Sequence, residues 1–283
     1  MRILVTGAAG LLGTDLSQDL GVAGAAVSTA TRTDLDVTDA EACIKAVERH
    51  DVVVNAAAWT AVDEAEAHES EAFAVNAVGA ANIARACDYA GARLVHISTD
   101  YVFGGEGTTP YAESAALAPA SAYGRTKAAG EWAAQALCRD TVVVRTAWLY
   151  GAHGSCFPRT IAAAMSRKPT IDVVTDQLGQ PTWTRDVAEL VRELLAARAP
   201  AGVYHATAGG QTSWHGFALA VAEAVGADPA RVHETTSSAS ARPAPRPAYS
   251  VLRHHTLEQV GVAPIGPWDE RWRVAAPSVL ADL

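Results

Sequence analysis

The chain has 283 residues, of which 49% are hydrophobic and 19% charged, and its formal net charge is −9. This acidic balance, together with the lack of a long unbroken apolar stretch, disfavours nucleic acid and membrane partners and suits a globular enzyme. The chain has 4 cysteines without a CxxC pair and no signal-peptide shape at its N-terminus, so we expect no metal site, no disulfides and a cytoplasmic location.

Short apolar runs alternate with Ala-rich helical stretches through the first half of the chain. We expect strands at residues 3–6, 25–29, 52–55, 94–98 and 142–146, and helices at residues 11–20, 39–49, 70–89 and 121–137. Continuous apolar strands that alternate with helices are typical of a parallel sheet covered on both faces. The sequence therefore predicts an α/β fold with a Rossmann-type, doubly wound parallel sheet.

The alternation loosens after Tyr150. Helices are expected at residues 157–167, 184–197 and 213–225, with short strands such as residues 203–205 between them. We expect residues 1–150 to form the dinucleotide-binding domain. Residues 151–283 would form mainly a smaller C-terminal substrate-binding lobe, with some segments returning to the Rossmann core. Residues 235–249 are rich in Ser, Ala and Pro, which predicts a surface loop.

A glycine motif follows the first expected strand and opens the first expected helix. Gly7, Gly10 and Gly13 stand in the spacing GxxGxxG, with Leu11 and Leu12 inside the motif. Glycine permits a tight turn and lets backbone N–H groups approach a pyrophosphate at a helix N-terminus. This position predicts a dinucleotide cofactor site.

The end of the second expected strand indicates which cofactor binds. An acidic residue there would bind the ribose 2′-hydroxyl of NADH, but residues 28–33 contain no carboxylate and do contain Arg32. Arginine suits a 2′-phosphate, so the sequence favours NADPH, with NADH as the alternative. Further cofactor contacts are expected at Asp36, Val37, Ala56, Ala57 and Ala58.

Tyr123 and Lys127 form a YxxxK pattern on an expected helix, where residues at this spacing share a face. A cation near a tyrosine lowers the pKa of its phenol, which can then pass a proton to a carbonyl oxygen. Thr99 follows the expected strand that ends at Ser98, and its hydroxyl can hydrogen-bond the same oxygen. Together with the glycine motif, these residues predict a redox site.

The motifs GAAGLLG, VVNAAAWTAVDEAE, STDYVF, YGRTK, RTAWLYG and TDQLGQPT occur in this order. Together they resemble the extended short-chain dehydrogenase/reductases and, within them, the dTDP-4-dehydrorhamnose reductase family. The resemblance extends from Met1 to about Trp272. STDYVF, YGRTK and RTAWLYG are the specific motifs, whereas GxxGxxG is common to the superfamily.

The resemblance implies that Thr99, Tyr123 and Lys127 are catalytic, with Tyr123 as proton donor and Lys127 on the nicotinamide ribose. It implies that the sugar pocket contains Val62, Asp100, Tyr101 and Trp148. It places Asn76 near the cofactor, Arg246 at the substrate diphosphate, and Gln180 on the substrate side. A core position for Trp148 and a turn position for Asp100 are the alternatives.

Some members of this family form a dimer bridged by Mg²⁺. Asp15 matches one ligand, but Arg185 stands where an acidic residue is needed, and arginine cannot bind a cation. We therefore expect no metal, and we leave a homodimer open.

The resemblance implies NADPH-dependent reduction of the C4 keto group of a dTDP-4-keto-6-deoxy-L-hexose, which gives dTDP-L-rhamnose. A first alternative is a related reductase of an antibiotic deoxysugar pathway, such as a dTDP-dihydrostreptose synthase. A second is a non-catalytic protein similar to the regulatory subunit of methionine adenosyltransferase. The presence of Thr99, Tyr123 and Lys127 favours an enzyme.

Overall fold

The computed structural model describes residues 1–239 and 241–281. Its centre is a six-stranded parallel sheet in the order β10-β5-β4-β3-β1-β2. The strands are β1 (Arg2–Thr6), β2 (Ala26–Ala30), β3 (Val52–Asn55), β4 (Arg93–Thr99), β5 (Thr141–Thr146) and β10 (Gly202–His205). The order reverses between β1 and β3, which is where doubly wound sheets bind nucleotides. The predicted fold class is confirmed.

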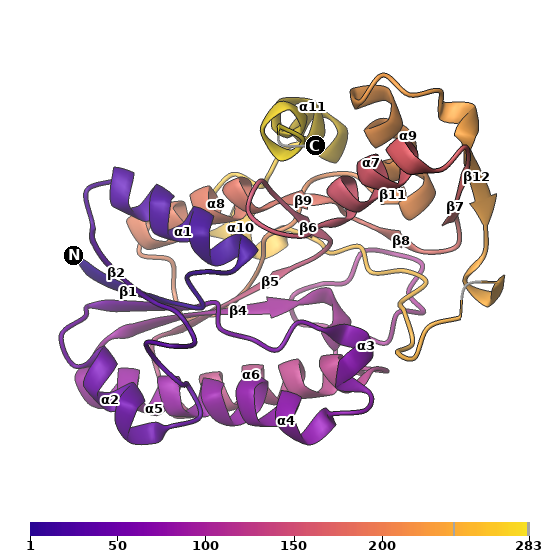
Figure 1. Cartoon of the computed structure of the whole chain (residues 1–283). Coiled ribbons are helices and arrows are strands. Elements are labelled where there is room, and N and C mark those ends of the chain that lie inside the picture. The colour runs from indigo at the N-terminus through magenta and orange to yellow at the C-terminus, as the bar shows by residue number, and fades with distance from the viewer. Residues whose placement is uncertain (240, 282–283) are drawn as a thin grey trace.

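Helices cover both faces of this sheet (Figure 1). One face carries α1 (Leu11–Val22), α8 (Thr184–Ala196) and α10 (His255–Gln259), and the other carries α2 (Ala40–Val47), α5 (Ala80–Ala90) and α6 (Ala122–Leu137). The four residues of β3 are all buried, because a central parallel strand has protein on both sides. No helix within the described ranges is long and apolar enough to cross a bilayer.

The helix expected at residues 70–89 is three elements in the structure. These are α4 (Glu69–Phe73), a π-helical turn (Ala74–Gly79) and α5, preceded by the short α3 (Val62–Ala65). A π-helical turn inside a helix is rare and is often found at functional sites. Here the side chain of Asn76, which belongs to this turn, hydrogen-bonds the backbone of Trp59. The sequence pattern around residues 70–89 gives no sign of this contact, because Trp59 lies 17 residues away.

The smaller lobe lies beyond one end of the sheet, at the upper right of Figure 1. Its helices are α7 (Phe157–Arg167), α9 (Trp214–Ala224) and α11 (Trp268–Val279). Tyr150, Phe217 and Trp272 pack in its core with ring centroids 5.3–5.4 Å apart. Although both follow Tyr150, β10 is a strand of the large sheet and α8 packs against that sheet, so the chain passes between the two parts more than once.

The lobe also contains three short two-stranded sheets that the sequence did not predict. β7 (Ile171–Val174) pairs with β12 (Val232–Thr235). β6 (Leu149–Tyr150) pairs with β9 (Thr182–Trp183), and β8 (Leu178–Gly179) pairs with β11 (Thr212–Ser213). Strands of two to four residues join segments far apart in the chain, so local periodicity is too short to reveal them.

Candidate active site

A cavity of about 990 Å³ opens at the carboxyl ends of β1, β3, β4 and β5. All of the residues expected at the site line it, except Asn76, Gln180 and Arg246. The carboxyl edge is where the ligands of open α/β sheets bind. The structure therefore brings the glycine motif and the YxxxK pattern, more than 100 residues apart, to one cavity.

The glycine turn is packed too closely for side chains. Gly7 has φ +66°, and a Cβ on it would lie 2.7 Å from the backbone of Ala56. A Cβ on Gly13 would lie 2.2 Å from the carbonyl oxygen of Gly7. Gly10 precedes α1, and the first residues of that helix, whose N–H groups have no partner within the helix, line the cavity. This backbone fits a dinucleotide pyrophosphate.

The far end of the cavity carries Arg32, which is exposed. Its acidic neighbours are held by hydroxyl groups: Asp34 accepts hydrogen bonds from Thr31, and Asp36 accepts them from Thr38. These hydrogen bonds lower the pKa of both carboxyls. Among the described residues, two cations line the cavity, Arg32 and Lys127, and Arg32 is the one that follows β2, where a ribose 2′-phosphate is expected.

The helix α6 brings Tyr123 and Lys127 to the cavity. Ser121 caps its first turn by accepting a hydrogen bond from the N–H of Gly124 (3.1 Å). Lys127 is buried, and its Nζ donates to the carbonyl oxygen of Ile97 on β4 (2.7 Å). The ring of Tyr123 packs edge-on against Tyr101, with centroids 5.6 Å apart.

Burial dominates the ionisation of this pair. It lowers the pKa of Lys127 to about 8, although the nearby Glu131 opposes the shift. It raises the pKa of Tyr123, although a hydrogen bond with Thr99 opposes that shift. The expected lowering of the Tyr123 pKa is therefore wrong for this structure, because loss of solvent outweighs the cation. Tyr123 keeps its proton at neutral pH, as a proton donor requires.

Asp100 follows Thr99 at the end of β4 and is buried. Its Oδ1 accepts a hydrogen bond from Thr99 Oγ1 (2.9 Å), and its Oδ2 has no hydrogen-bond partner in the described part of the chain. Burial raises its pKa to about 6, and the nearby hydroxyls of Ser250 and Thr99 oppose this shift. An unpartnered carboxylate oxygen beside the Thr99 hydroxyl is suited to accept a hydrogen bond from a sugar hydroxyl.

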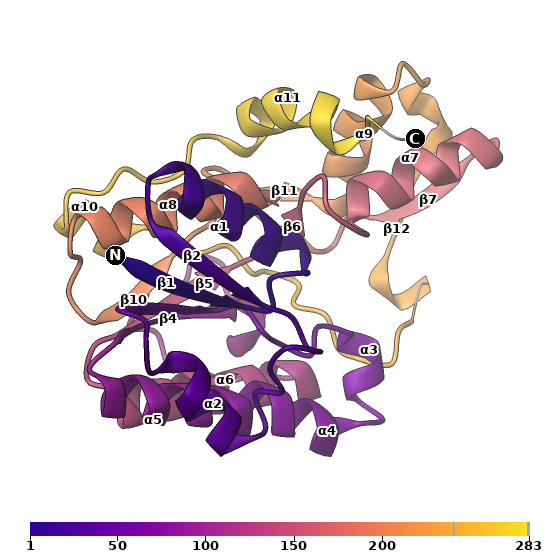
Figure 2. The same cartoon turned by 60° about the vertical axis from the view of Figure 1, so that its left-hand side comes forward.

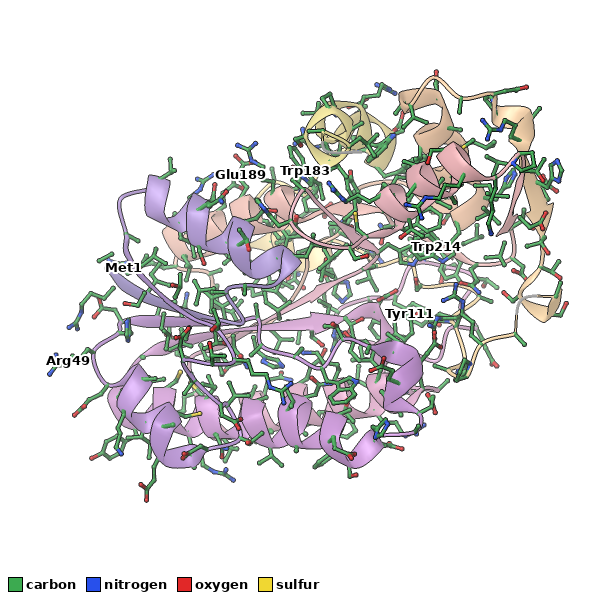
Figure 3. The ribbon with its side chains drawn as sticks, in the orientation of Figure 1. Met1, Arg49, Tyr111, Trp183, Glu189 and Trp214 are labelled. Atoms are coloured by element: carbon green, nitrogen blue, oxygen red, sulfur yellow. The ribbon has the colours of Figure 1, made fainter. Side chains whose placement is uncertain are left out.

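Trp148 forms the wall of the cavity nearest the smaller lobe. Its ring stacks on that of Trp214, with centroids 3.6 Å apart and planes 5° apart. Trp214 belongs to the lobe and is labelled in Figure 3. The backbone of Trp148 has φ +46°, which is uncommon for a bulky residue and is found where function requires it. Val62 lines the same cavity from the start of α3.

Gln180 does not line the cavity, so the expected contact between Gln180 and the substrate is wrong. Its Nε2 donates to the carbonyl oxygens of Ala208 and Leu252, and its Oε1 accepts from Thr207 and from the N–H of Leu252. Its hydrogen-bonding capacity is used within the protein, and the side chain is 2% exposed. Gln180 therefore joins chain segments. The GQPT motif gave no sign of this because these partners are 27 and 72 residues away.

Asn76 also lies behind the cavity wall rather than on it. Its side chain bonds both the N–H and the carbonyl oxygen of Trp59 and donates to Thr126 Oγ1 (2.9 Å). Trp59 itself lines the cavity. Asn76 therefore joins Trp59, which lines the cavity, to the first turns of α6.

Arg246 lies beside the main cavity, in the segment 241–252 that runs next to α3 (Figure 2). Its Nη2 pairs with Asp63 Oδ2 (2.9 Å), and its guanidinium lies 6.0 Å from the ring centroid of Tyr101. The expected surface loop is thus anchored, because Tyr249 donates its N–H to the carbonyl oxygen of Gly105 (2.9 Å) and Ala244 donates to Asp63. The ion pair with Asp63 and the hydrogen bond from Nη1 to the carbonyl oxygen of Ala244 hold Arg246 in place and leave N–H donors over, so its contact with the substrate diphosphate stays a prediction.

The structure adds two groups of residues at the cavity that the sequence did not predict. Thr146 ends β5 and lines the cavity next to Thr99, its register partner on β4. Its position at a strand end was the available signal. Behind the cavity, Glu131 accepts hydrogen bonds from Ser98 (2.5 Å) and from Arg145 (2.7 Å). The signal there was one polar residue on each of two predicted apolar strands, Ser98 and Arg145.

Asp15, the residue that matches a metal ligand of the family, has partners within the chain. Its Oδ2 accepts a hydrogen bond from Thr184 (2.5 Å), and its Oδ1 lies 3.6 Å from His153. Arg185 lies over the ring of Trp183, 5.5 Å from its centroid. Within residues 1–239 and 241–281, no three His, Cys, Asp or Glu side chains gather as metal ligands would.

The chain matches the family model of the RmlD substrate binding domain over residues 1–280. It is 49% identical to a dTDP-4-dehydrorhamnose reductase of Streptomyces griseus, over 94% of this chain and 90% of that protein. It is 46% identical to a dTDP-4-keto-6-deoxy-D-glucose reductase of Streptomyces niveus, over 99% of this chain and 98% of that protein. A crystal structure of a dTDP-4-dehydrorhamnose reductase from Bacillus anthracis in complex with NADP has a TM-score of 0.94 and 33% identity, covering 97% of this chain and 98% of that one. The resemblance inferred from the motifs is confirmed, and the chain belongs to the RmlD substrate binding domain family.

Proposed function

We propose that this chain is an NADPH-dependent reductase of the C4 keto group of a dTDP-4-keto-6-deoxy-L-hexose, giving dTDP-L-rhamnose. The observation that carries the proposal is the meeting of Thr99, Tyr123 and Lys127 with the glycine turn at one cavity. Family membership supports the same reaction. Residues 1–150 would bind the cofactor, and the lobe formed mainly by residues 151–283 would bind the sugar nucleotide.

The residues have distinct roles in this mechanism. When bound, NADPH supplies the hydride. Tyr123 donates its phenolic proton to the carbonyl oxygen, and Thr99 hydrogen-bonds that oxygen. Lys127 has three N–H donors, and one is directed to Ile97, which leaves two for the ribose hydroxyls of the cofactor. The free Oδ2 of Asp100 accepts a hydrogen bond from a sugar hydroxyl.

A second candidate function changes the sugar and keeps the chemistry. The relative from Streptomyces niveus is named for dTDP-4-keto-6-deoxy-D-glucose, so another dTDP-keto sugar is an alternative substrate. Small differences in a pocket decide between such isomers. A regulatory, non-catalytic role is disfavoured because a protein without turnover has no need to keep a buried lysine and a protonated tyrosine at an open cavity.

A panel of dTDP-4-keto-6-deoxyhexoses tests the reaction and its substrate together. We expect NADPH oxidation with the L-configured sugar formed by a 3,5-epimerase, and much slower oxidation with its D-configured precursor. Product stereochemistry would be assigned by NMR. Faster turnover of the D-sugar would favour the second candidate, and no NADPH oxidation with either sugar would contradict both.

Arg32 is predicted to select the cofactor. In Arg32→Ala, the ratio of kcat/KM for NADPH to that for NADH should fall about 10- to 100-fold, the effect of losing a hydrogen-bonded charge pair. Arg49→Ala is the matched control, because Arg49 is an exposed arginine distant from the cavity (Figure 3). A wild-type protein that prefers NADH would contradict the proposal.

The proposed location is the cytoplasm, consistent with four buried free cysteines in the described residues. A homodimer is a hypothesis that sedimentation velocity tests. If it forms, it should persist in EDTA, because Asp15 is already bonded to Thr184.

A further inference from the structure

The hydroxyl of Thr146 has no part in the mechanism proposed above. It is 4% exposed, and its Oγ1 has no hydrogen-bond partner among the described residues. A buried polar group without a partner costs about 1–3 kcal/mol, so such groups need an explanation. Four buried side-chain atoms in the described chain share this condition, and only those of Asp100 and Thr146 belong to residues that line the cavity.

The position of Thr146 relates it to the reacting group. Thr146 and Thr99 are register partners on the adjacent parallel strands β5 and β4. Partners in register point to the same face of a sheet, about 4.8 Å apart. Thr146 lies on the side of Thr99 away from β1 and its glycine turn. The chain then continues through Ala147 to Trp148, which faces the smaller lobe.

We propose that Thr146 is a substrate-binding residue whose hydroxyl hydrogen-bonds the hexose hydroxyl next to the keto carbon. Thr99 faces the carbonyl oxygen, so a hydroxyl one strand further from the cofactor turn meets the neighbouring ring substituent. Asp100 Oδ2 and Thr146 Oγ1 then form a pair of unsatisfied atoms that a sugar with two hydroxyls can satisfy together. This inference rests on the proposed function and adds a specificity determinant to it.

The isosteric variant Thr146→Val separates a ligand-binding hydroxyl from a structural one. It should lower kcat/KM for the dTDP-keto sugar about 3- to 10-fold, the value of one neutral hydrogen bond, and leave the Kd for NADPH unchanged. Its Tm should stay the same or rise, because a methyl group replaces an unpartnered hydroxyl. Thr146→Ser should restore kcat/KM.

Thr141→Val is the matched control on the same strand. Thr141 is equally buried, but its hydroxyl donates to the carbonyl oxygens of Ala134 (3.1 Å) and Cys138 (2.8 Å). This variant should lower Tm and leave kcat/KM unchanged. The two threonines should therefore give opposite patterns of stability and activity.

The result that would overturn the inference is a Thr146→Val protein with unchanged kcat/KM, or one in which only NADPH binding weakens. Calorimetric binding of dTDP-L-rhamnose to the NADP-loaded protein gives a second readout without turnover. If the wild type binds the sugar nucleotide but does not oxidise NADPH, the proposed function fails. A loss of sugar binding in Thr146→Val would still support the inference in that case.

Discussion

Tyr123→Phe should reduce kcat by about 10²–10⁴-fold, the usual contribution of a positioned proton donor. Only the phenolic oxygen is removed, and the ring keeps its edge-on contact with Tyr101. Because burial raises the pKa of Tyr123, the wild type carries its proton throughout the neutral range. The loss should appear in kcat with little change in the Kd for NADPH, measured by single-turnover kinetics and fluorescence titration.

Tyr89→Phe is the control for this variant. Tyr89 is 82% exposed, so its hydroxyl serves neither the core nor the cavity. It should turn over like the wild type. Near-normal turnover by Tyr123→Phe would mean that another group supplies the proton, and the mechanism given above would be wrong.

Glu131→Ala should lower the free energy of unfolding by about 3–5 kcal/mol, because it leaves a buried cation without its partner. Glu131 is fully buried and pairs with Arg145, which is 3% exposed. Arg145 donates through Nε (2.9 Å) and Nη2 (2.7 Å), so both prongs of the guanidinium would lose their acceptor. Urea denaturation at constant m-value measures the loss.

Glu69→Ala is the matched control, since Glu69 pairs with Arg125 through two hydrogen bonds at the surface. Exposed ion pairs contribute only about 0–1 kcal/mol to the free energy of unfolding, so this variant should lose little stability. An equal loss in the two variants would contradict the interpretation of the buried pair.

Glu131→Gln gives a second, kinetic readout of the same pair. Burial lowers the pKa of Lys127 to about 8, and the charge of Glu131 opposes that shift. Without this charge the pKa of Lys127 falls further, so Lys127 loses its proton at lower pH. The alkaline limb of the kcat/KM profile should then move to lower pH, a change that a purely structural role for Glu131 would not produce.

The cofactor half of the site was predictable because its parts are local. A strand, a glycine turn and a helix follow one another within residues 2–22. The conformation of the turn therefore depends on residues that are neighbours in the chain. Tyr123 and Lys127 share one turn of α6 for the same reason. The role of Gln180 was not predictable, because its partners come from segments that only folding brings together.

The direction of the Tyr123 pKa also depended on the fold. The spacing of Tyr123 and Lys127 places a cation near the phenol, but it carries no information on how much solvent remains around either group. Desolvation opposes the charged form of both side chains, so burial raised one pKa and lowered the other.

The sequence by itself determined the class of sheet, the glycine turn, the YxxxK pair and the family. Each of these rests on residues that are neighbours in the chain. Only the tertiary structure decided that Thr99 and Thr146 are register partners on neighbouring strands. The same is true of the ion pairs between Glu131 and Arg145 and between Asp63 and Arg246. These depend on strand register and on burial, which the chain acquires when distant segments pack and water leaves the space between them.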